Sequence, residues 1–588
     1  MKYRTLHKWD DPDGCRGLIL FAQLLEELLF DYSMDTYKSS VMQTGTLCYE
    51  ALLTLSEIEA GNIKAPNLGH VLAEICASYE KDDVAQNLVT LNRASFVAIF
   101  KNPKSSHGEI KTVLEIILRE LEYDRYKIEN EKLLIAEIEG AQSAVAIRKL
   151  TRSYLTTLSW GGFSQKYIQE IGQDFFHYGQ NRIGSSAAIR DFLAKFNDAS
   201  KEHTAVFRVD SAFDEIQSTA KKIGIDIYRD MPDDLIAHQR LLPLASSGEV
   251  YAVIRKIPAK DRFVARESAE AKLKLSQTLL NLFHHKNSLS WIGDCLILDG
   301  DLKTPQLSRK PLNPMLKCVD RKIGVAGFKL EKFVQEFSLE NDSFSKFIRS
   351  SLLHTMALDS DSGENQLLNL WISLESLIPS ETKADDVSNI EHIVNSLLPF
   401  LNMGYLRRLV NNLVKDLLRW DRKEITKAFR DVEGAKFHEK LARIIALDEY
   451  RAKRDSIEKS IEDFYLLRDR FDYFKSLFAS PENVFVALDT HKVRLEWQIR
   501  RIYRTRNIIV HSGTAPRFTN QLIEHTHDYL DIVLDSLVRL ASSPQIIESV
   551  GQGFKYVELQ YKSYLSQLSV RGVAFDNKNM SELVFGKV

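Results

Sequence analysis

The sequence predicts a mainly α-helical protein: a helical N-terminal region, a small α/β or α+β middle module and a C-terminal helical bundle. Glycine and proline are scarce, at 26 and 14 of 588 residues, which favours long helices joined by short loops because both residues interrupt helices. Apolar residues recur at helical spacing over most of the chain, whereas short β-branched and aromatic runs are confined to its middle. At roughly 150 residues per domain, we expect three to four domains.

The predicted N-terminal helical region covers residues 1–150. An apolar stripe runs from Leu18 to Leu29 at helical spacing, and residues 110–134 read as one amphipathic helix with a charged face. Turn-forming residues at 101–108 predict a loop.

Residues 151–335 form the predicted mixed module, a candidate sensor. Helical patterns alternate there with four strand-like runs, at 204–209, 223–228, 249–254 and 291–298. Residues 302–313 read as a linker, and no glycine-rich nucleotide motif is present.

The predicted helical bundle covers residues 340–588. Its strongest helical segments are 367–378, 387–418, 437–478, 484–510 and 520–540.

Composition narrows the class of protein. The net charge is −2, from 78 basic and 80 acidic residues, so any affinity for nucleic acid must come from a local patch. The five cysteines are widely spaced and include no Cys-x-x-Cys pair, so we expect no disulfide framework and no zinc ribbon. We also expect no cofactor. The first residues are polar, and no apolar run reaches the ~18 residues of a membrane span. We therefore expect a cytoplasmic protein without a membrane partner.

Residues 492–517 concentrate positive charge. This segment holds one acid, Glu496, and seven basic residues, namely Lys492, Arg494, Arg500, Arg501, Arg504, Arg506 and Arg517. Arg506 falls on the apolar stripe of the predicted helix, and Gly513 is suited to end that helix. His511 then lies at the helix C-terminus, where the helix dipole stabilises an imidazolium, and it shares a face with Asn507.

This constellation suits RNA cleavage without a metal. A histidine can move a proton to or from the 2′-hydroxyl or the leaving 5′-oxygen, and an arginine can stabilise the charge that builds on the phosphate. Attack by the 2′-hydroxyl yields a 2′,3′-cyclic phosphate, so DNA is not cut by this route. We predict Arg506, His511 and Asn507 as catalytic residues, and Arg500, Arg501 and Arg504 as RNA-binding residues. The spacing alone is unspecific, because Arg349 and His354 share it.

Two motifs taken together resemble a known family. Arg506-Asn-Ile-Ile-Val-His511 matches the Arg-polar-x3-His signature of the HEPN superfamily, and residues 364–377 resemble the first core helix of its Apea-like family through a Leu-Trp-x-x-Leu-Glu-x-Leu pattern. The resemblance covers about residues 340 to 570. It implies a metal-independent ribonuclease of bacterial antiphage defence, commonly a homodimer in which two signature helices meet. Its RNA substrate, by analogy transfer RNA, and a phage-derived trigger are further expectations. The chain departs from the family pattern in the long insertion between the two motifs.

Several readings remain open. Glu375 either orients Arg506 or forms an edge salt bridge, and Tyr503 and Trp497 either stack on bases or pack in the core. The pairs His284–His285 and His525–His527 lack zinc-site spacing and read as surface histidines, so no metal ligands are predicted. Two alternatives to the nuclease are a non-catalytic RNA- or protein-binding sensor module and a toxin-like chain silenced by its own N-terminal half.

Overall fold

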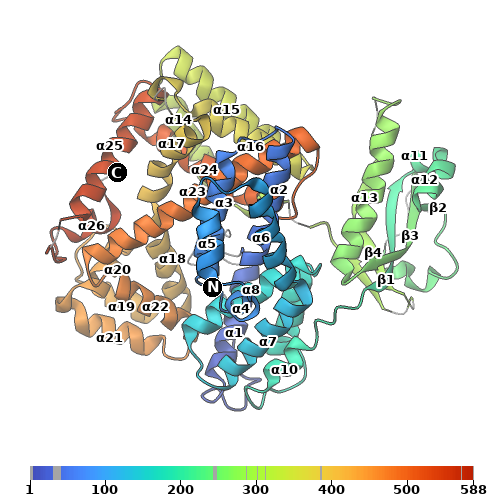
Figure 1. Cartoon of the computed structure of the whole chain (residues 1–588), viewed down its shortest axis with the longest axis horizontal. Coiled ribbons are helices and arrows are strands. Elements are labelled where there is room, and N and C mark those ends of the chain that lie inside the picture. The colour runs from blue at the N-terminus through green and yellow to red at the C-terminus, as the bar shows by residue number, and fades with distance from the viewer. Residues whose placement is uncertain are drawn as a thin grey trace. The chain divides into compact units, whose positions relative to one another are not determined.

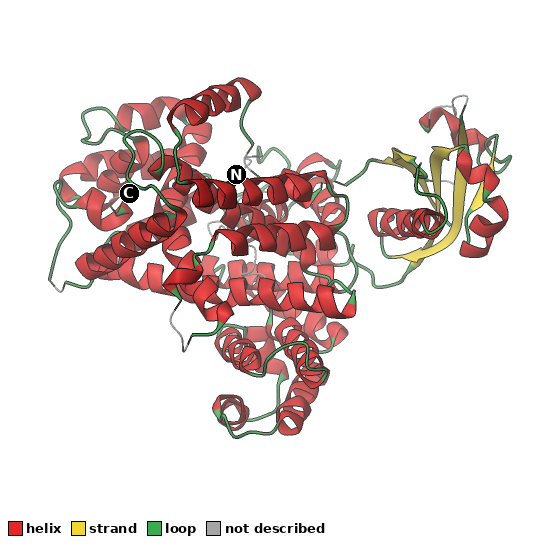
Figure 2. Ribbon diagram, turned by 90° about the horizontal axis from the view of Figure 1, so that it is seen from above, coloured by secondary structure: helices red, strands yellow, loops and turns green. Residues whose placement is uncertain are grey.

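The computed structural model describes residues 4–30, 42–242, 248–286, 288–300, 302, 304–311, 313–318, 320–383, 387–570 and 572–586. Within these ranges the chain is mainly helical and forms one small antiparallel sheet (Figures 1 and 2). The predicted fold class is thereby confirmed. No helix in the described ranges combines the length and the apolar character needed to cross a bilayer.

The chain divides into two compact units that interleave along the sequence. Unit 1 comprises Met1–Tyr3, Tyr32–Glu122 and Asn313–Val588, and unit 2 comprises Arg4–Asp31 and Tyr123–Leu312. This division differs from the predicted boundaries at 150 and 335, because the first 150 residues contribute to both units. The helix predicted over 110–134 is in fact two helices, α6 (His107–Glu120) and α7 (Tyr123–Glu139), and they belong to different units. Neither glycine nor proline marks the break between them.

The N-terminal part of unit 1 is a run of five helices, of which the last three begin at a side-chain cap. The side chains of Asp82, Asn92 and Ser106 each accept a hydrogen bond from a backbone N–H in the first turn of the helix that follows. The loop predicted at 101–108 is confirmed between the helix that ends at Lys101 and the helix that begins at His107. The helices are α2 (Thr44–Glu59), α3 (Pro66–Tyr79), α4 (Asp83–Leu88), α5 (Arg93–Lys101) and α6.

The C-terminal part of unit 1 is the predicted bundle. Each predicted segment contains helix, but 387–418 divides at Gly404 and 437–478 holds three helices rather than one. The helices are α14 (Ile323–Glu336), α15 (Asn341–Asp359), α16 (Gly363–Leu377), α17 (Asn389–Met403), α18 (Tyr405–Trp420), α19 (Arg422–Ala428), α20 (Phe437–Ala446), α21 (Arg451–Ser460), α22 (Tyr465–Leu477), α23 (Pro481–Ser512), α24 (Thr519–Leu540), α25 (Val550–Leu568) and α26 (Met580–Phe585), with short 3₁₀ turns at Pro314–Lys317, Ser380–Thr382 and Asp448–Tyr450.

Helix α23 is 32 residues long, and specific residues begin and end it. The Ser480 side chain accepts a hydrogen bond from the Asn483 N–H, and Pro481 occupies the first turn, where its missing N–H costs nothing. At the other end Gly513 adopts a left-handed conformation with φ of 67°, and its N–H donates to the Ile509 carbonyl. Gly513 therefore ends the helix as the sequence predicts.

Unit 2 contains a helical part that precedes the sheet. Its helices are α1 (Arg16–Phe30), α7, α8 (Ala144–Trp160), α9 (Gln165–Gln173) and α10 (Ala188–Leu193), with a π-helical turn at Asp174–Tyr178. The first strand begins only at residue 201, so residues 151–193 belong with the helices and not with the mixed module.

The sheet of unit 2 has five strands in the order β2-β3-β1-β4-β5, all antiparallel. Helix α13 (Arg262–Asn281) contacts β1, β3 and β4, which makes the module α+β. The strand β5 lies inside the predicted linker. The strands are β1 (Lys201–Asp210), β2 (Asp226–Tyr228), β3 (Glu249–Ala259), β4 (Trp291–Asp299) and β5 (Pro305–Ser308), and the remaining helical turns are α11 (Ala212–Glu215), α12 (Gln217–Ile223) and a 3₁₀ turn at Ile236–Leu241.

Candidate active site

The two helices that carry the family motifs pack against each other. Trp371 of α16 is buried, and its ring lies 5.8 Å from the ring of Tyr503 on α23, measured between centroids. Of the two readings of Tyr503, the structure therefore shows packing against Trp371. This contact places the α16 motif beside the helix that carries Arg506 and His511.

Arg506 and Asn507 are joined directly. The Arg506 Nη1 donates a hydrogen bond of 2.9 Å to the Asn507 Oδ1, and the Arg506 Nε is buried without a hydrogen-bond partner among the described residues. Asn507 is buried and Arg506 is half-buried. The amide thus holds the guanidinium in one orientation and leaves part of its donor capacity unused.

His511 occupies a different environment. It lies in the last turn of α23 and is exposed, as are Val510 and Ser512 on either side of it. An α-helix turns about 100° per residue, so positions five apart project about 140° apart, whereas Asn507 and His511 are only about 40° apart. The backbone positions of Arg506 and His511 therefore lie on different sides of α23.

Glu375 lies away from this constellation. The residue is exposed on α16, and within the described ranges its carboxylate forms neither a hydrogen bond nor an ion pair. Both readings of Glu375, orientation of Arg506 and an edge salt bridge, lack a contact in the structure.

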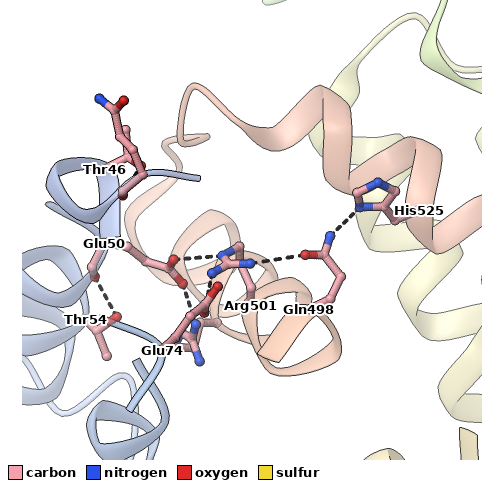
Figure 3. A network of polar contacts seen from close by, with 9 residues as sticks. Thr46, Glu50, Thr54, Glu74, Gln498, Arg501 and His525 are labelled. Atoms are coloured by element: carbon pink, nitrogen blue, oxygen red, sulfur yellow. Dashed lines mark hydrogen bonds and ion pairs between the residues drawn. The ribbon is translucent and has the colours of Figure 1, made fainter. Parts of the chain in front are cut away.

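The three arginines predicted to bind RNA are buried and paired with carboxylates. Arg500, Arg501 and Arg504 are only 4%, 1% and 2% exposed. The Arg500 Nη2 lies 2.5 Å from Glu391. The Arg501 Nε donates to Glu50 at 2.8 Å and its Nη2 to Glu74 at 2.5 Å (Figure 3). Arg504 also donates to Glu50. These guanidinium groups therefore lie inside unit 1 and not on the cationic surface that the sequence predicts.

The cluster of Glu50, Glu74, Arg501 and Arg504 fastens α2 and α3 to α23. Burial raises the pKa of Glu74, whereas at Glu50 the charges of Arg501 and Arg504 outweigh burial and lower its pKa. The contacts continue from Arg501 to Gln498 and from Gln498 to His525 of α24 (Figure 3). Two carboxylates thus balance two guanidinium groups in an interior where unpaired charge is costly.

His525 and His527 are buried, at 4% and 3% exposed, so their prediction as surface histidines is wrong. The His527 Nε2 lies 2.8 Å from the Nε2 of His354 on α15. Burial lowers the pKa of both His354 and His527. The sequence does hold a signal for this cluster, because His527 and Asp531 are four positions apart and therefore share one face of a helix.

A cavity of 470 Å³ opens elsewhere in unit 1 and has a partly cationic lining. Burial lowers the pKa of two of its lining groups, Arg407 and His438. None of the residues predicted as catalytic lines this cavity. It is lined by Arg407, Lys436, His438, Glu439, Tyr556, Gln560, Ser581, Phe585 and Gly586.

No protein-family model, no curated protein and no solved structure matches the chain. The resemblance to the HEPN superfamily thus rests on the two sequence motifs, and the contact of α16 with α23 is the structural observation that accompanies it.

Proposed function

We propose that the protein is a metal-independent endoribonuclease whose catalytic residues are Arg506, Asn507 and His511, acting in antiphage defence. The observation that carries the proposal lies at the C-terminal end of α23. There the Asn507 amide holds the Arg506 guanidinium, and the exposed His511 imidazole follows five residues after Arg506. The contact between Trp371 and Tyr503 supports it, because the two motifs pair in the structure as well as in the sequence.

The proposed reaction is a transesterification within the RNA. A base removes the 2′-hydroxyl proton, the 2′-oxygen bonds to phosphorus, the bond from phosphorus to the 5′-oxygen breaks, and an acid protonates that oxygen. The products are a 2′,3′-cyclic phosphate and a 5′-hydroxyl. His511 transfers protons in this scheme, because imidazole is suited to both roles near neutral pH. Arg506 stabilises the charge on the phosphate with guanidinium donors, and Asn507 orients Arg506.

The backbone positions of Arg506 and His511 lie about 140° apart on α23, and we propose that the site is made by two chains. If two α23 helices meet about a two-fold axis, Arg506 of one copy and His511 of the other can reach one phosphate. The active species in this proposal is therefore a homodimer, as the family resemblance implies. Transfer RNA as the substrate and a phage component as the trigger follow from that resemblance alone.

The first test is cleavage of total RNA by the purified full chain in excess EDTA. We expect fragments with 2′,3′-cyclic phosphate and 5′-hydroxyl ends from the wild type and none above background from His511→Ala. His107→Ala, which alters an exposed histidine of α6, is the matched control and should cleave normally. Equal cleavage by the His511→Ala variant contradicts the proposal.

A second test separates a shared site from a site within one chain. Arg506→Ala and His511→Ala should each be inactive alone. Mixed dimers of the two variants should recover up to half of the wild-type activity, because one of their two sites then holds both intact residues. No recovery in dimers that are shown to have formed contradicts a site shared between copies.

The alternative of a non-catalytic, protein-binding sensor module is favoured by one observation. Helix α14 buries none of its side chains, and Ile323, Phe328 and Val334 are 92%, 68% and 74% exposed. An apolar surface of this kind marks sites of protein interaction. This alternative would be supported if the wild-type chain binds a protein partner and leaves RNA intact both with and without that partner.

A further inference from the structure

Three potential metal ligands from two helices converge in unit 1. His354 comes from α15, and His527 and Asp531 come from α24. One ligand atom from each side chain lies within 4.8 Å of the other two. His527 and Asp531 are four positions apart and share one face of α24, the same geometric principle by which helical zinc sites present two ligands.

The separations of the ligand atoms fit a tetrahedral ion after small movements. Two ligand atoms bound at 2.0–2.1 Å with a tetrahedral angle are roughly 3.3 Å apart. The Nε2 atoms of His354 and His527 are 2.8 Å apart. The two oxygens of Asp531 face different histidines, with Oδ1 3.9 Å from the His354 Nε2 and Oδ2 3.6 Å from the His527 Nε2. Each pair therefore differs from the ideal separation by about 0.6 Å or less, which side-chain rotation can supply.

The surroundings of His527 are those of a positioned ligand. Its ring faces the backbone of Met315, which lies in the 3₁₀ turn before α14. Histidines that bind metals generally turn their second nitrogen towards a backbone carbonyl or a carboxylate, which fixes the ring and its tautomer. The imidazole of His527 is 3% exposed, whereas the Asp531 side chain is 48% exposed, so the cluster is closed on one side and open to solvent on the other.

Charged groups of both signs surround the three side chains. Asp528 and Asp535 flank Asp531 on α24. Arg321 and Lys329 lie 3.5 Å and 3.6 Å from Asp535. The Nε2 atoms of the two histidines face each other and the Asp531 carboxylate. Without an ion, one imidazole N–H must donate a hydrogen bond to the other imidazole nitrogen. A metal ion would replace that proton and bind both nitrogens.

We propose that His354, His527 and Asp531 bind one divalent transition-metal ion, with Zn²⁺ as the best match, and leave a coordination position open to solvent. Two imidazole nitrogens and a carboxylate oxygen suit zinc, whereas calcium and magnesium prefer sites built from oxygen ligands. The bound ion links α15 to α24. This site shares no residue with the proposed nuclease, and neither proposal depends on the other.

The test uses the full chain, stripped of metal by a chelator and then titrated with Zn²⁺ or Co²⁺. We expect one equivalent of zinc per chain by elemental analysis, a cobalt spectrum of tetrahedral intensity, and a rise in Tm on adding zinc. His354→Gln and Asp531→Asn should each weaken zinc binding by at least about tenfold and abolish the Tm rise. Both variants alter side chains that are not fully buried, so in EDTA we expect them to unfold like the wild type.

His107→Gln serves as the matched control and should bind zinc like the wild type. Substoichiometric zinc in the wild type, or unchanged affinity in folded His354→Gln and Asp531→Asn, overturns the proposal. RNA cleavage in EDTA is a separate measurement, so loss of the metal site and loss of the nuclease are distinguished.

Discussion

Two stretches of α23 have similar sequences but different surroundings. In the upstream stretch Arg500, Arg501 and Arg504 are buried and paired with glutamates. In the downstream stretch Arg506 is half-buried and hydrogen-bonded to Asn507, and His511 is exposed. The comparison shows that a basic residue on an amphipathic helix has no fixed role, because its partners come from distant parts of the chain. We therefore expect upstream substitutions to change stability and downstream substitutions to change catalysis.

The largest effect should follow removal of the charge at the centre of the upstream cluster. Glu50→Gln leaves Arg501 and Arg504 with one buried carboxylate instead of two, and breaking a buried pair typically costs about 3–5 kcal/mol. Urea unfolding should show this loss in the free energy of unfolding. Glu59→Gln, an exposed change on the same helix, should have little effect, and RNA cleavage per folded Glu50→Gln molecule should match the wild type.

Arg506→Lys should test the downstream stretch through RNA cleavage. Lysine keeps the charge but loses the planar fork that contacts two phosphate oxygens, and we expect a decrease in kcat/KM of about 10²-fold. The Tm should change little. Arg349→Lys, an exposed arginine with the same spacing to a histidine, is the control, and an equal loss in both variants would remove the distinction between the two stretches.

The upstream stretch also predicts a dependence of stability on pH. Burial, together with the charges of Arg500 and Arg504 and against that of Glu391, lowers the pKa of His70 from 6.5 to about 4. As the pH falls from 6.5 towards 4, the unfolded chain binds a proton that the folded chain does not, so stability decreases. Because His70 is only half-buried, we expect it to contribute a loss of about 2 kcal/mol by pH 4, less than the full pKa difference implies. In urea unfolding at pH 7, 5.5 and 4, His70→Gln should therefore lose less stability than the wild type by about this amount. Identical pH slopes in the two proteins would contradict this assignment.

The smallest effect is expected at Asn507. Asn507→Ala removes the acceptor that orients Arg506, and a hydrogen bond to a charged group is worth about 1.5–3 kcal/mol, so cleavage should fall about tenfold or more. Asn507→Asp keeps an acceptor and should retain more activity than Asn507→Ala. The reverse order would show that the bond seen at 2.9 Å does not position the guanidinium for catalysis.

Local patterns predicted the parts of the molecule that local interactions decide. The end of α23 at Gly513 follows from a residue that tolerates positive φ, and β1, β3 and β4 follow from β-branched runs. Two features gave no local signal. No glycine or proline marks the break between α6 and α7, and β5 is short and lies in a polar segment. The pairing of Arg501 with Glu50 and of His354 with His527 could not be predicted, because tertiary packing joins residues that no sequence spacing relates.

The ion cluster of α2, α3 and α23 also constrains when the protein can finish folding. Glu50 precedes Arg501 by 451 residues, so at a synthesis rate of about 5–20 residues per second its counter-charge leaves the ribosome tens of seconds later. Until then α2 and α3 carry two carboxylates that cannot be buried without cost. Unit 1 can therefore close only after residue 504 has left the ribosome. A fragment that starts after residue 335 would lack Glu50 and Glu74 and would leave Arg501 and Arg504 without these carboxylates.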